Sequence, residues 1–439
     1  MIPEYLSLQI PDGPHPRVVI VGGGFAGIEF AKALKNKPFQ VVLLDRNNYH
    51  TFQPLLYQVA TAGLEPDSIA GPLRKAFDGY KNFFFRMVKV QRVDYQNQLV
   101  KTPIGSLRYD YLVLASGSAT NFFGLDQVKR YAFPLKQVVH ALNLRSHILQ
   151  NFEKAVLTDN DEARTALMNV VVVGGGPTGV EVAGALGELQ KHILPGDFPD
   201  LDFSDMQVYL IEGTDRLLNT MSPKSGQKSK QYLEKFGIQI LLNQLVVDYD
   251  GDSVYLDNGE VLDCQTLIWA AGVQGNVVEG IPAESLKHNR IQVDAYHQVI
   301  DMPRVFALGD VALMNADEGY PQGHPMVAQV AIQQGRSLAK NFVCLLRNKP
   351  PKPFKYRDKG SMATVGRNRA VVDFPQGGQM SGLWAWLVWM FIHLISLIGF
   401  RNKLVTLTNW MWSYFTYDKG NRLIIRTFDK KKRSPVEVN

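Results

Sequence analysis

The sequence predicts an α/β fold made of two copies of one strand–turn–helix domain, followed by an apolar helical segment near the C-terminal end. Two observations carry this prediction. The segment Val21–Leu34 (VGGGFAGIEFAKAL) recurs further along the chain as Val173–Leu186 (VGGGPTGVEVAGAL). Two segments that read as buried strands ending in glycine also match, Tyr111–Gly117 (YLVLASG) and Thr266–Gly272 (TLIWAAG). A pattern of this length that occurs twice indicates a duplicated domain.

The first copy opens with a run of apolar β-branched residues, which predicts a short buried strand. Gly22, Gly24 and Gly27 follow in a G-x-G-x-x-G pattern, and the next residues have helical spacing. Glycine at these places permits a tight turn, a close approach of a pyrophosphate to the backbone, and tight packing of helix on strand. Asp45 ends the next apolar run, where a carboxylate that binds a ribose hydroxyl is expected. The sequence therefore predicts two Rossmann-like dinucleotide-binding domains.

The second copy repeats the glycine pattern with Gly174, Gly176 and Gly179, and Glu212 ends its next apolar run. This acid comes later than in the first copy because an added loop, rich in proline, aspartate and glycine, precedes it. A carboxylate accepts hydrogen bonds from ribose hydroxyls and repels a 2′-phosphate, so Glu212 favours NAD(H) over NADP(H). Arg216 lies four residues further on and would soften that preference.

The composition is that of a globular protein, with 46% hydrophobic and 20% charged residues. The first residues lack a basic start followed by an apolar core, so we expect no signal peptide. The two cysteines, Cys264 and Cys344, do not form a C-x-x-C pair, which argues against a disulfide framework and a dithiol redox centre. We also expect no metal, because no cluster of His, Cys and Asp stands out in the sequence.

The segment 383–400 is apolar, with His393 as its one titratable side chain, and a second apolar and aromatic run follows at 404–417. Tryptophan and tyrosine beside basic residues are typical of a membrane interface. Three interpretations stay open: helices lying in one leaflet, a spanning helix at the lower length limit, and a buried dimerisation helix. The basic end of the chain suggests an anionic lipid surface as partner. We expect no nucleic acid, because this end adjoins apolar surface rather than a stacking groove.

Two further segments carry candidate binding residues. Asp310 follows Gly309 at the end of an apolar run, where an acid either binds a ribityl or phosphate group or caps a helix. The segment 325–341 has helical spacing and places Gln329 and Gln333 on one face. Small alanines beside them would let this helix approach a flat ring, and a solvated glutamine face is the alternative.

Two dinucleotide folds in one chain favour transfer of a hydride from a diffusible nicotinamide to a tightly held flavin. The first copy is the expected FAD site, because the segment at Asp310 returns to it, and the second is the expected NADH site. The missing dithiol and the apolar C-terminal end favour a membrane-soluble electron acceptor. The expected domains are residues 1–145 with 275–350 for FAD, 146–274 for NADH, and 351–439 for a C-terminal domain with amphipathic anchor helices.

With these motifs, the chain from Arg17 to Tyr417 resembles the type II NADH dehydrogenases, the single-subunit, non-proton-pumping NADH:quinone oxidoreductases of the two-dinucleotide-binding-domain flavoprotein superfamily. The most specific marker is Ala328–Gln334 (AQVAIQQ), which fits the family's A-Q-x-A-x-Q-Q pattern. The family's monotopic membrane anchor, A-W-x-x-W-x-x-x-H, is matched by Ala385, Trp386, Trp389 and His393. Several relatives place a basic residue near the quinone pocket where this chain has 376–380 (QGGQM), which leaves the proton route to the quinone open.

The resemblance implies an FAD-dependent enzyme that passes electrons from NADH to a membrane quinone such as ubiquinone or menaquinone. Gln329 and Gln333 are the implied quinone contacts. Glu181 is implied near the nicotinamide and flavin, either in a proton relay or in a structural role, with Glu29 as its counterpart near FAD. The segment 49–58 would run beside the flavin. The implied FAD contacts are Gly22, Gly24, Phe25, Ala26, Gly27, Asp45, Ala115, Ser116, Gly117, Asp310 and Gln329, and the implied NADH contacts are Gly174, Gly176, Thr178, Gly179, Glu181, Glu212, Ala271 and Gly272.

We expect a peripheral, monotopic protein on the cytoplasmic face of a bacterial inner membrane, and a homodimer through the tail stays open. Three other functions compete with this prediction. A sulfide:quinone oxidoreductase relative would need paired cysteines beside the flavin. A soluble-type NADH-dependent reductase of a small electron-carrier protein would not need the tryptophan-rich tail. A membrane-recruited NAD-binding sensor would bind both nucleotides without turnover.

Overall fold

The computed structural model describes residues 6–416, 420–424 and 428. The chain forms two compact units. Unit 1 is Met1–His50, Gly71–Ala119 and Val273–Asp358, and unit 2 is Thr51–Ala70, Thr120–Gly272 and Lys359–Asn439. Each unit contains one of the two glycine-rich turns found in the sequence. The division into three domains remains a prediction.

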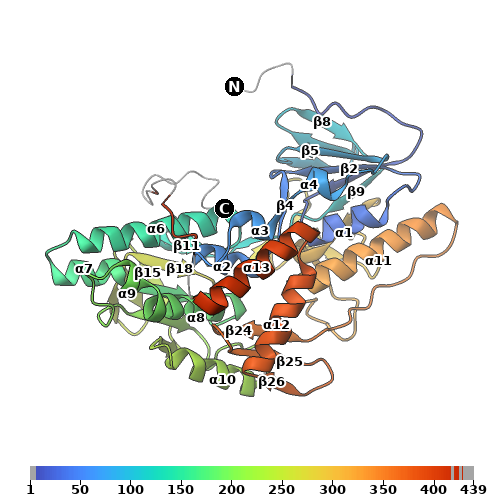
Figure 1. Ribbon diagram of the computed structural model, residues 1–439. Helices are drawn as coiled ribbons and strands as arrows, with labels where there is room; N and C mark the ends of the chain where they lie inside the picture. Colours follow the sequence, from blue (N-terminus) through green and yellow to red (C-terminus); the bar gives the residue numbers. More distant parts are fainter. Residues whose placement is uncertain (1–5, 417–419, 425–427, 429–439) are drawn as a thin grey trace. The chain divides into compact units, whose positions relative to one another are not determined.

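Unit 1 is built on a five-stranded parallel sheet in the order β22-β9-β1-β2-β5 (Figure 1). The strands are β1 (Arg17–Val21), β2 (Gln40–Asp45), β5 (Phe83–Met87), β9 (Tyr111–Leu114) and β22 (Val305–Ala307). Apart from the edge strand β5, they are almost wholly buried, which is typical of parallel strands covered on both faces.

Two helices of unit 1 pack closely against each other, α1 (Phe25–Ala33) and α11 (Ala328–Leu346). The close approach depends on Gly335, because a Cβ at this position would lie 2.5 Å from the carbonyl oxygen of Ala26. The sequence predicted the second helix from 325 onward, but it begins at Ala328, after Pro325. The short helix α4 (Leu73–Ala76) also belongs to this unit.

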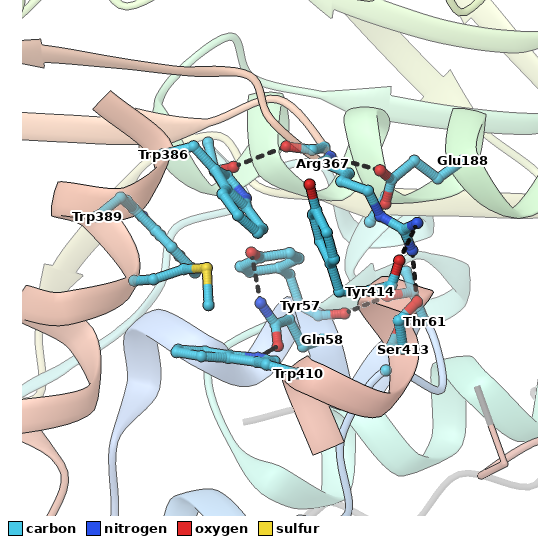
Figure 2. Close-up of a pocket in the computed structure, with 15 residues that line it drawn as sticks. Tyr57, Gln58, Thr61, Glu188, Arg367, Trp386, Trp389, Trp410, Ser413 and Tyr414 are labelled. Atoms are coloured by element: carbon cyan, nitrogen blue, oxygen red, sulfur yellow. Dashed lines mark hydrogen bonds between the residues drawn. The ribbon is translucent and has the colours of Figure 1, made fainter. Parts of the chain in front are cut away.

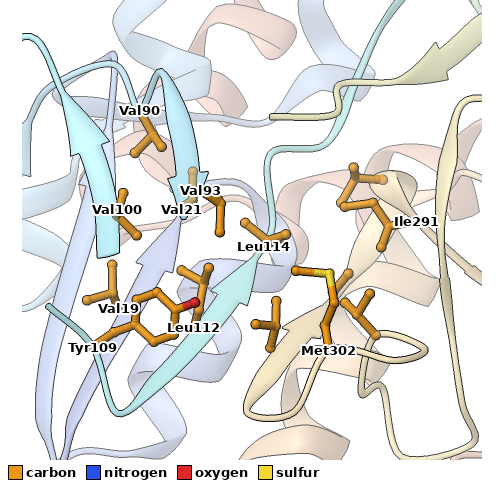
Figure 3. Close-up of a cluster of buried hydrophobic side chains, with 14 of the residues drawn as sticks. Val19, Val21, Val90, Val93, Val100, Tyr109, Leu112, Leu114, Ile291 and Met302 are labelled. Carbon is orange, nitrogen blue, oxygen red and sulfur yellow. The ribbon is translucent and has the colours of Figure 1, made fainter. Parts of the chain in front are cut away.

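An antiparallel meander and a small mixed sheet complete unit 1. The meander is β6 (Arg92–Asp94), β7 (Leu99–Thr102) and β8 (Gly105–Arg108), and the mixed sheet is β20 (Leu286–Lys287), β21 (Arg290–Val293) and β23 (Ala312–Met314). β5 precedes the meander in the chain but joins the parallel sheet, because it pairs with β2. Figure 3 shows a buried cluster of unit 1, in which Val19 and Leu112 of the parallel sheet pack with Val100 of the meander and with Met302.

Unit 2 repeats the parallel sheet, now in the order β11-β18-β12-β13-β14. The order β18-β12-β13-β14 matches β9-β1-β2-β5 of unit 1, so the predicted duplication is confirmed. The strands are β11 (Phe133–Pro134), β12 (Val170–Val173), β13 (Val208–Glu212), β14 (Gln239–Leu242) and β18 (Thr266–Trp269), and the meander is β15 (Val246–Tyr249), β16 (Ser253–Leu256) and β17 (Val261–Asp263). The helices are α2 (Leu56–Ala60), α3 (Pro66–Ile69), α5 (Asp126–Tyr131), α6 (Val138–Val156), α7 (Asp161–Met168), α8 (Pro177–His192), α9 (Leu194–Asp197) and α10 (Pro223–Glu234).

The C-terminal part of unit 2 is a three-stranded antiparallel sheet and two helices. The strands are β24 (Ser361–Thr364), β25 (Ala370–Asp373) and β26 (Gln379–Ser381), and the helices are α12 (Leu383–Ser396) and α13 (Phe400–Thr416). The apolar segment 383–400 is therefore not one helix, because the chain turns at Gly399 with a φ of +89°. Among the described residues, no helix has both the length and the apolar character needed to cross a membrane.

Candidate functional site: two nucleotide cradles and an aromatic cavity

The glycine turn of unit 1 leaves room for a ligand at one position and none at the others. Gly22 has a φ of +110°, and a Cβ there would lie 2.2 Å from the carbonyl oxygen of Ala115. A Cβ at Gly27 would lie 2.0 Å from the carbonyl oxygen of Gly22. Gly24, which caps α1, faces open space, because a Cβ there would meet nothing within 4 Å. The first N–H groups of α1 are thus open to a phosphate, as a dinucleotide requires.

Asp45 is held by two backbone N–H groups beside this turn. Its Oδ2 accepts a hydrogen bond from the Gly23 N–H at 2.6 Å, and its Oδ1 accepts one from the Asn47 N–H at 2.7 Å. Burial raises the pKa of the Asp45 carboxyl, and these two N–H groups act against that rise. Gly23 was missed in the sequence analysis. The run of three consecutive glycines was the available signal, since a Cβ at Gly23, the middle one, would lie only 3.2 Å from Asp45 Oδ2.

Unit 2 reproduces this arrangement around Glu212. Its Oε2 accepts a hydrogen bond from the Gly175 N–H at 2.6 Å, and its Oε1 accepts one from the Thr214 N–H at 2.9 Å. Gly174 has a φ of +105°, and Gly176 faces open space as Gly24 does. Each carboxylate is therefore oriented by the middle glycine of its own turn. Of the other predicted NADH contacts, Gly179 is buried under the turn and Thr178 is exposed on the first turn of α8, while Ala271 and Gly272 follow β18.

The remaining predicted FAD contacts of unit 1 lie at the ends of the parallel strands and the start of α1. Asp310 Oδ2 accepts a hydrogen bond from the Ser118 hydroxyl at 2.5 Å, which ties it to the loop after β9. In the same loop, the Ser116 hydroxyl donates to the Asn276 carbonyl at 2.6 Å, and Gly117 has a φ of +72°. The residues of this set that lie along the loop and at α1 are Phe25, Ala26, Ala115, Ser116 and Gly117.

The three glutamines of α11 have different surroundings. Gln333 uses both ends of its amide on the backbone of one residue, donating to the Arg357 carbonyl at 2.9 Å and accepting from the Arg357 N–H at 3.1 Å. Gln334, which the sequence analysis did not select, is buried and accepts a hydrogen bond from the Gly309 N–H at 2.7 Å. Gln329 is partly buried in the first turn of the helix. The roles of Gln329 and Gln333 in quinone binding remain predictions.

Glu181 is a buried acid on α8 in unit 2. The Thr364 N–H donates to its Oε1 at 3.4 Å. Burial raises the pKa of Glu181 to about 8, and the Thr364 N–H and the indole of Trp389 act against the rise. The Trp389 Nε1 forms no ordinary hydrogen bond within the described part of the chain, so its effect on Glu181 is a weaker electrostatic one. At neutral pH the Glu181 carboxyl is therefore mostly protonated.

A cavity of about 90 Å³ lies beside α12 and α13, and all the residues that line it belong to unit 2. Its walls are largely aromatic, as Figure 2 shows, and are formed by Tyr57, Trp386, Trp389, Trp410 and Tyr414. Gln58, Glu188 and Arg367 supply its polar groups. The sequence analysis did not predict this cavity, because its walls come from five separate segments of the chain.

Arg367 holds the end of α13 at this cavity. Its guanidinium donates to the Ser413 carbonyl at 2.6 Å and to the Tyr414 carbonyl at 2.9 Å, and its backbone N–H donates to Glu188 Oε1 (Figure 2). Arg367 lies on the turn between β24 and β25.

The predicted anchor pattern lies on the inner side of α12. Ala385 and Trp389 are buried, Trp386 and His393 are partly buried, and His393 stacks on Trp389 with ring centroids 4.1 Å apart. Burial lowers the pKa of His393 to about 4, so this side chain is neutral at physiological pH. By contrast, Trp384 is 70% exposed and Phe415 is 78% exposed, and neither belongs to the pattern. The pattern therefore packs into unit 2, and the apolar surface is formed by its neighbours on α12 and α13.

Comparisons with known proteins agree with the two cradles. Residues 16–335 match the family model described as pyridine nucleotide-disulphide oxidoreductase, and residues 359–416 match the model described as the NDH2 C-terminal domain. The chain belongs to the pyridine nucleotide-disulphide oxidoreductase family.

Within this family the chain is a member of the type II NADH:quinone oxidoreductases. The relative of that name from Mycobacterium tuberculosis, Ndh, is 36% identical over 440 residues, which cover 97% of this chain and 93% of the relative. The type II enzyme of Haemophilus influenzae is 30% identical over 81% of this chain and 86% of its own. The predicted family is thereby confirmed.

Solved structures show the same fold. The NDH2 of Plasmodium falciparum in complex with NADH superposes with a TM-score of 0.85 at 21% identity, over 94% of this chain and 100% of that one. A sulfide:quinone oxidoreductase from Aquifex aeolicus reaches a TM-score of 0.70 at 21% identity, over 92% and 96% of the two chains. The competing sulfide enzyme thus shares the fold, and the sequence relatives separate the two families.

Proposed function

We propose that this chain transfers electrons from NADH through FAD to a membrane quinone, without pumping protons. The observation that carries the proposal is the pair of equivalent cradles, in which Asp45 and Glu212 are each held at 2.6 Å by the middle glycine of a turn. The names of the curated relatives, which are NADH:quinone oxidoreductases, support the same activity.

The residues of unit 1 fit FAD. The chemistry that FAD supplies when bound is acceptance of a hydride and release of its two electrons to a second substrate. Gly22, Gly24 and Gly27 would admit the pyrophosphate, and Asp45 would accept a hydrogen bond from a ribose hydroxyl. Asp310, oriented by Ser118, would bind the ribityl or phosphate part. The other proposed FAD contacts are Phe25, Ala26, Ala115, Ser116, Gly117 and Gln329.

The residues of unit 2 fit NADH as the substrate. Glu212 retains lone pairs for the adenine-ribose hydroxyls and would repel a 2′-phosphate. Gly174, Gly176, Thr178 and Gly179 would admit the pyrophosphate at the start of α8. The remaining proposed contacts are Glu181, Ala271 and Gly272.

We assign the acceptor side to the C-terminal helices. Exposed aromatic and aliphatic side chains gather on α12 and α13, and Trp384, Phe391 and Trp412 are each more than 60% exposed. Arg401 and Lys403 lie in the first turn of α13, where they would meet anionic headgroups. The proposed attachment is peripheral, on the cytoplasmic membrane face, where NADH is found. A quinone held in that lipid surface would have the aromatic cavity as its nearest polar, ring-lined pocket.

The activity is tested with purified holoenzyme, NADH and a short-chain quinone. We expect the quinone to raise the rate of NADH oxidation well above the oxygen background. A quinone with no effect would refute the proposal.

The Gln329→Ala variant tests the predicted quinone contact. Reoxidation of the enzyme by quinone should slow, while reduction of the enzyme by NADH stays near the wild-type rate. The reverse pattern would remove Gln329 from that role.

Membrane attachment is tested by flotation with vesicles that contain anionic lipid. Replacing Trp412 and Phe415 together with serine should weaken binding strongly, because it removes two exposed apolar anchors. The matched control is Leu157→Ser, which removes an apolar side chain that is 84% exposed on another part of unit 2 and should bind as wild type does. Unchanged binding of the double variant, with a dimer in lipid-free solution, would favour dimerisation through these helices instead.

A further inference from the structure

Three side chains at the aromatic cavity form a hydrogen-bond chain with one direction. The Trp410 Nε1–H donates to Gln58 Oε1 at 2.8 Å, and Gln58 Nε2 donates to the Tyr57 oxygen at 2.8 Å (Figure 2). An indole N–H is a donor and never an acceptor, so Trp410 sets which end of the Gln58 amide faces it. The amide nitrogen must then face Tyr57.

The direction of this chain leaves the hydroxyl hydrogen of Tyr57 out of the bond with Gln58. Tyr57 lines the cavity and is buried, and its ring lies 6.5 Å from the ring of Trp389. Its position is held from the backbone as well, because the Thr61 hydroxyl donates to the Tyr57 carbonyl at 3.0 Å. A phenol that accepts from Gln58 and is fixed in this way can donate to a group inside the cavity.

Burial, with a smaller electrostatic effect of Glu181, raises the pKa of Tyr57 well above its usual value. The phenol therefore keeps its proton until a stronger base is present. A quinone oxygen becomes such a base only while it is being reduced, which is where a general acid lowers the barrier.

We propose that the Tyr57 hydroxyl is the proton donor to a quinone oxygen in this cavity, and that Gln58 and Trp410 orient it. This rests on the proposed NADH:quinone activity. The overall reaction is NADH, one proton and quinone to NAD⁺ and quinol, with both electrons supplied by NADH. The Tyr57 O–H bond breaks as one quinol O–H bond forms, and the hydrogen that leaves NADH supplies the second quinol proton. Solvent then returns a proton to the Tyr57 phenolate.

The test uses Tyr57→Phe holoenzyme, which keeps the ring and loses the hydroxyl. We expect reduction by NADH at the wild-type rate and reoxidation by a short-chain quinone slower by about 10²-fold or more, the usual contribution of a general acid. Ferricyanide takes electrons without a proton, so reoxidation by ferricyanide should stay at the wild-type rate. Reoxidation by quinone within twofold of wild type, or an equal loss with ferricyanide, would overturn the proposal.

The matched control is Tyr109→Phe in unit 1. Tyr109 is also buried, and its hydroxyl has no hydrogen-bond partner among the described residues. We expect this variant to react with both acceptors as wild type does. Wild-type enzyme that reduces ferricyanide but no quinone would contradict the proposed function itself, which is a different result from a quinone-active Tyr57→Phe enzyme.

Two further variants test the chain if Tyr57→Phe fails to bind FAD. Gln58→Leu and Trp410→Phe leave the hydroxyl in place but remove its orientation, so each should slow reoxidation by quinone and leave the ferricyanide rate intact. Binding of a non-reducible quinone analogue is measured by quenching of tryptophan fluorescence, since Trp386, Trp389 and Trp410 line the cavity. Binding in all variants within a few-fold of wild type supports a role in proton donation, and no quenching in the wild type would refute the cavity as the site.

Discussion

Glu181 is the buried acid with the clearest consequence for stability. Its pKa is raised to about 8 in the folded protein from an ordinary value near 4.5. Between these values the unfolded chain has lost the proton that the folded protein keeps, so the free energy of unfolding falls as the pH rises from about 4.5 to 8. Above pH 8 both states are ionised, and this contribution becomes constant.

The Glu181→Gln variant should lose this pH dependence. Relative to wild type, we expect its free energy of unfolding to increase by up to a few kcal/mol between pH 5 and pH 8. The measurement is denaturant unfolding at several pH values. Glu234→Gln on α10 is the control, because Glu234 is exposed and pairs only with Lys230 at 3.8 Å. If the free energy of unfolding depends on pH in the same way for wild type and Glu181→Gln, the acid is not buried as described.

Glu212 is the residue that we propose discriminates between NADH and NADPH. Replacing it with serine removes a charged acceptor for the ribose hydroxyls, and a hydrogen bond to a charged group contributes about 1.5–3 kcal/mol. We therefore expect kcat/KM for NADH to fall by roughly 10- to 100-fold and the value for NADPH to rise relative to it. Steady-state kinetics with both nucleotides check this, with the exposed Glu260→Ser as control. An unchanged ratio of the two values would contradict the assignment.

At the scale of elements, the contact of α1 with α11 depends on one glycine. In Gly335→Ala the new methyl group would lie 2.5 Å from the Ala26 carbonyl oxygen, so the helices must separate. Overpacking of this kind costs about 1–3 kcal/mol, and it would also shift the first turn of α1 at the proposed FAD site. We expect a lower melting temperature and a smaller FAD content, measured by thermal unfolding and by flavin absorbance.

The control for this substitution is Gly196→Ala on α9. A Cβ at Gly196 would meet nothing within 4 Å. That variant should therefore melt with the wild type and keep its FAD. Equal melting of all three proteins would mean that α1 and α11 do not approach as closely as the structure shows.

At the scale of the whole molecule, buried histidines give stability an acid limit. Burial lowers the pKa of His50 and His393 to about 4 and that of His297 to about 3. Each buried histidine makes its full contribution to the free energy of unfolding above the unfolded-state pKa of about 6.5. This contribution is lost as the pH falls from there toward 4. This slope is opposite to that of Glu181. Three histidines outweigh the single acid below about pH 6.5, so these groups together make the free energy of unfolding greatest near pH 6.5.

The His393→Phe variant keeps a ring stacked on Trp389 and removes one of these titrations. It should lose less stability than wild type between pH 6.5 and pH 4, by about 3 kcal/mol at most. Unfolding at pH 7 and pH 4.5 measures the difference. His15→Phe, at an exposed position, should follow the wild type at both values. If the free energy of unfolding of His393→Phe also changes with pH as that of the wild type does, then His393 is not neutral in the folded protein.

The duplicated fold, both glycine turns and their acids could be predicted from the sequence because they are local. Strand, turn, helix and acid recur in one order, and the reason for each glycine is a backbone contact made inside that same motif, such as Gly27 against Gly22. The comparisons confirm the family that these motifs and AQVAIQQ indicated. The contacts assigned to individual nucleotide-binding residues remain predictions.

Packing between distant parts of the chain determines which side chains are buried and which hydrogen bonds they form. Trp389 and Trp412 look alike in an apolar stretch, but only Trp389 faces the interior, where α12 packs on β24, β25 and β26. Gln333 resembles a free polar side chain until the chain at Arg357 returns to it. Tyr57 and Trp410 are joined through Gln58 across more than 350 residues of sequence. No spacing rule connects such positions, so burial and hydrogen-bond direction, and with them the proposed proton donor, became visible only in the folded chain.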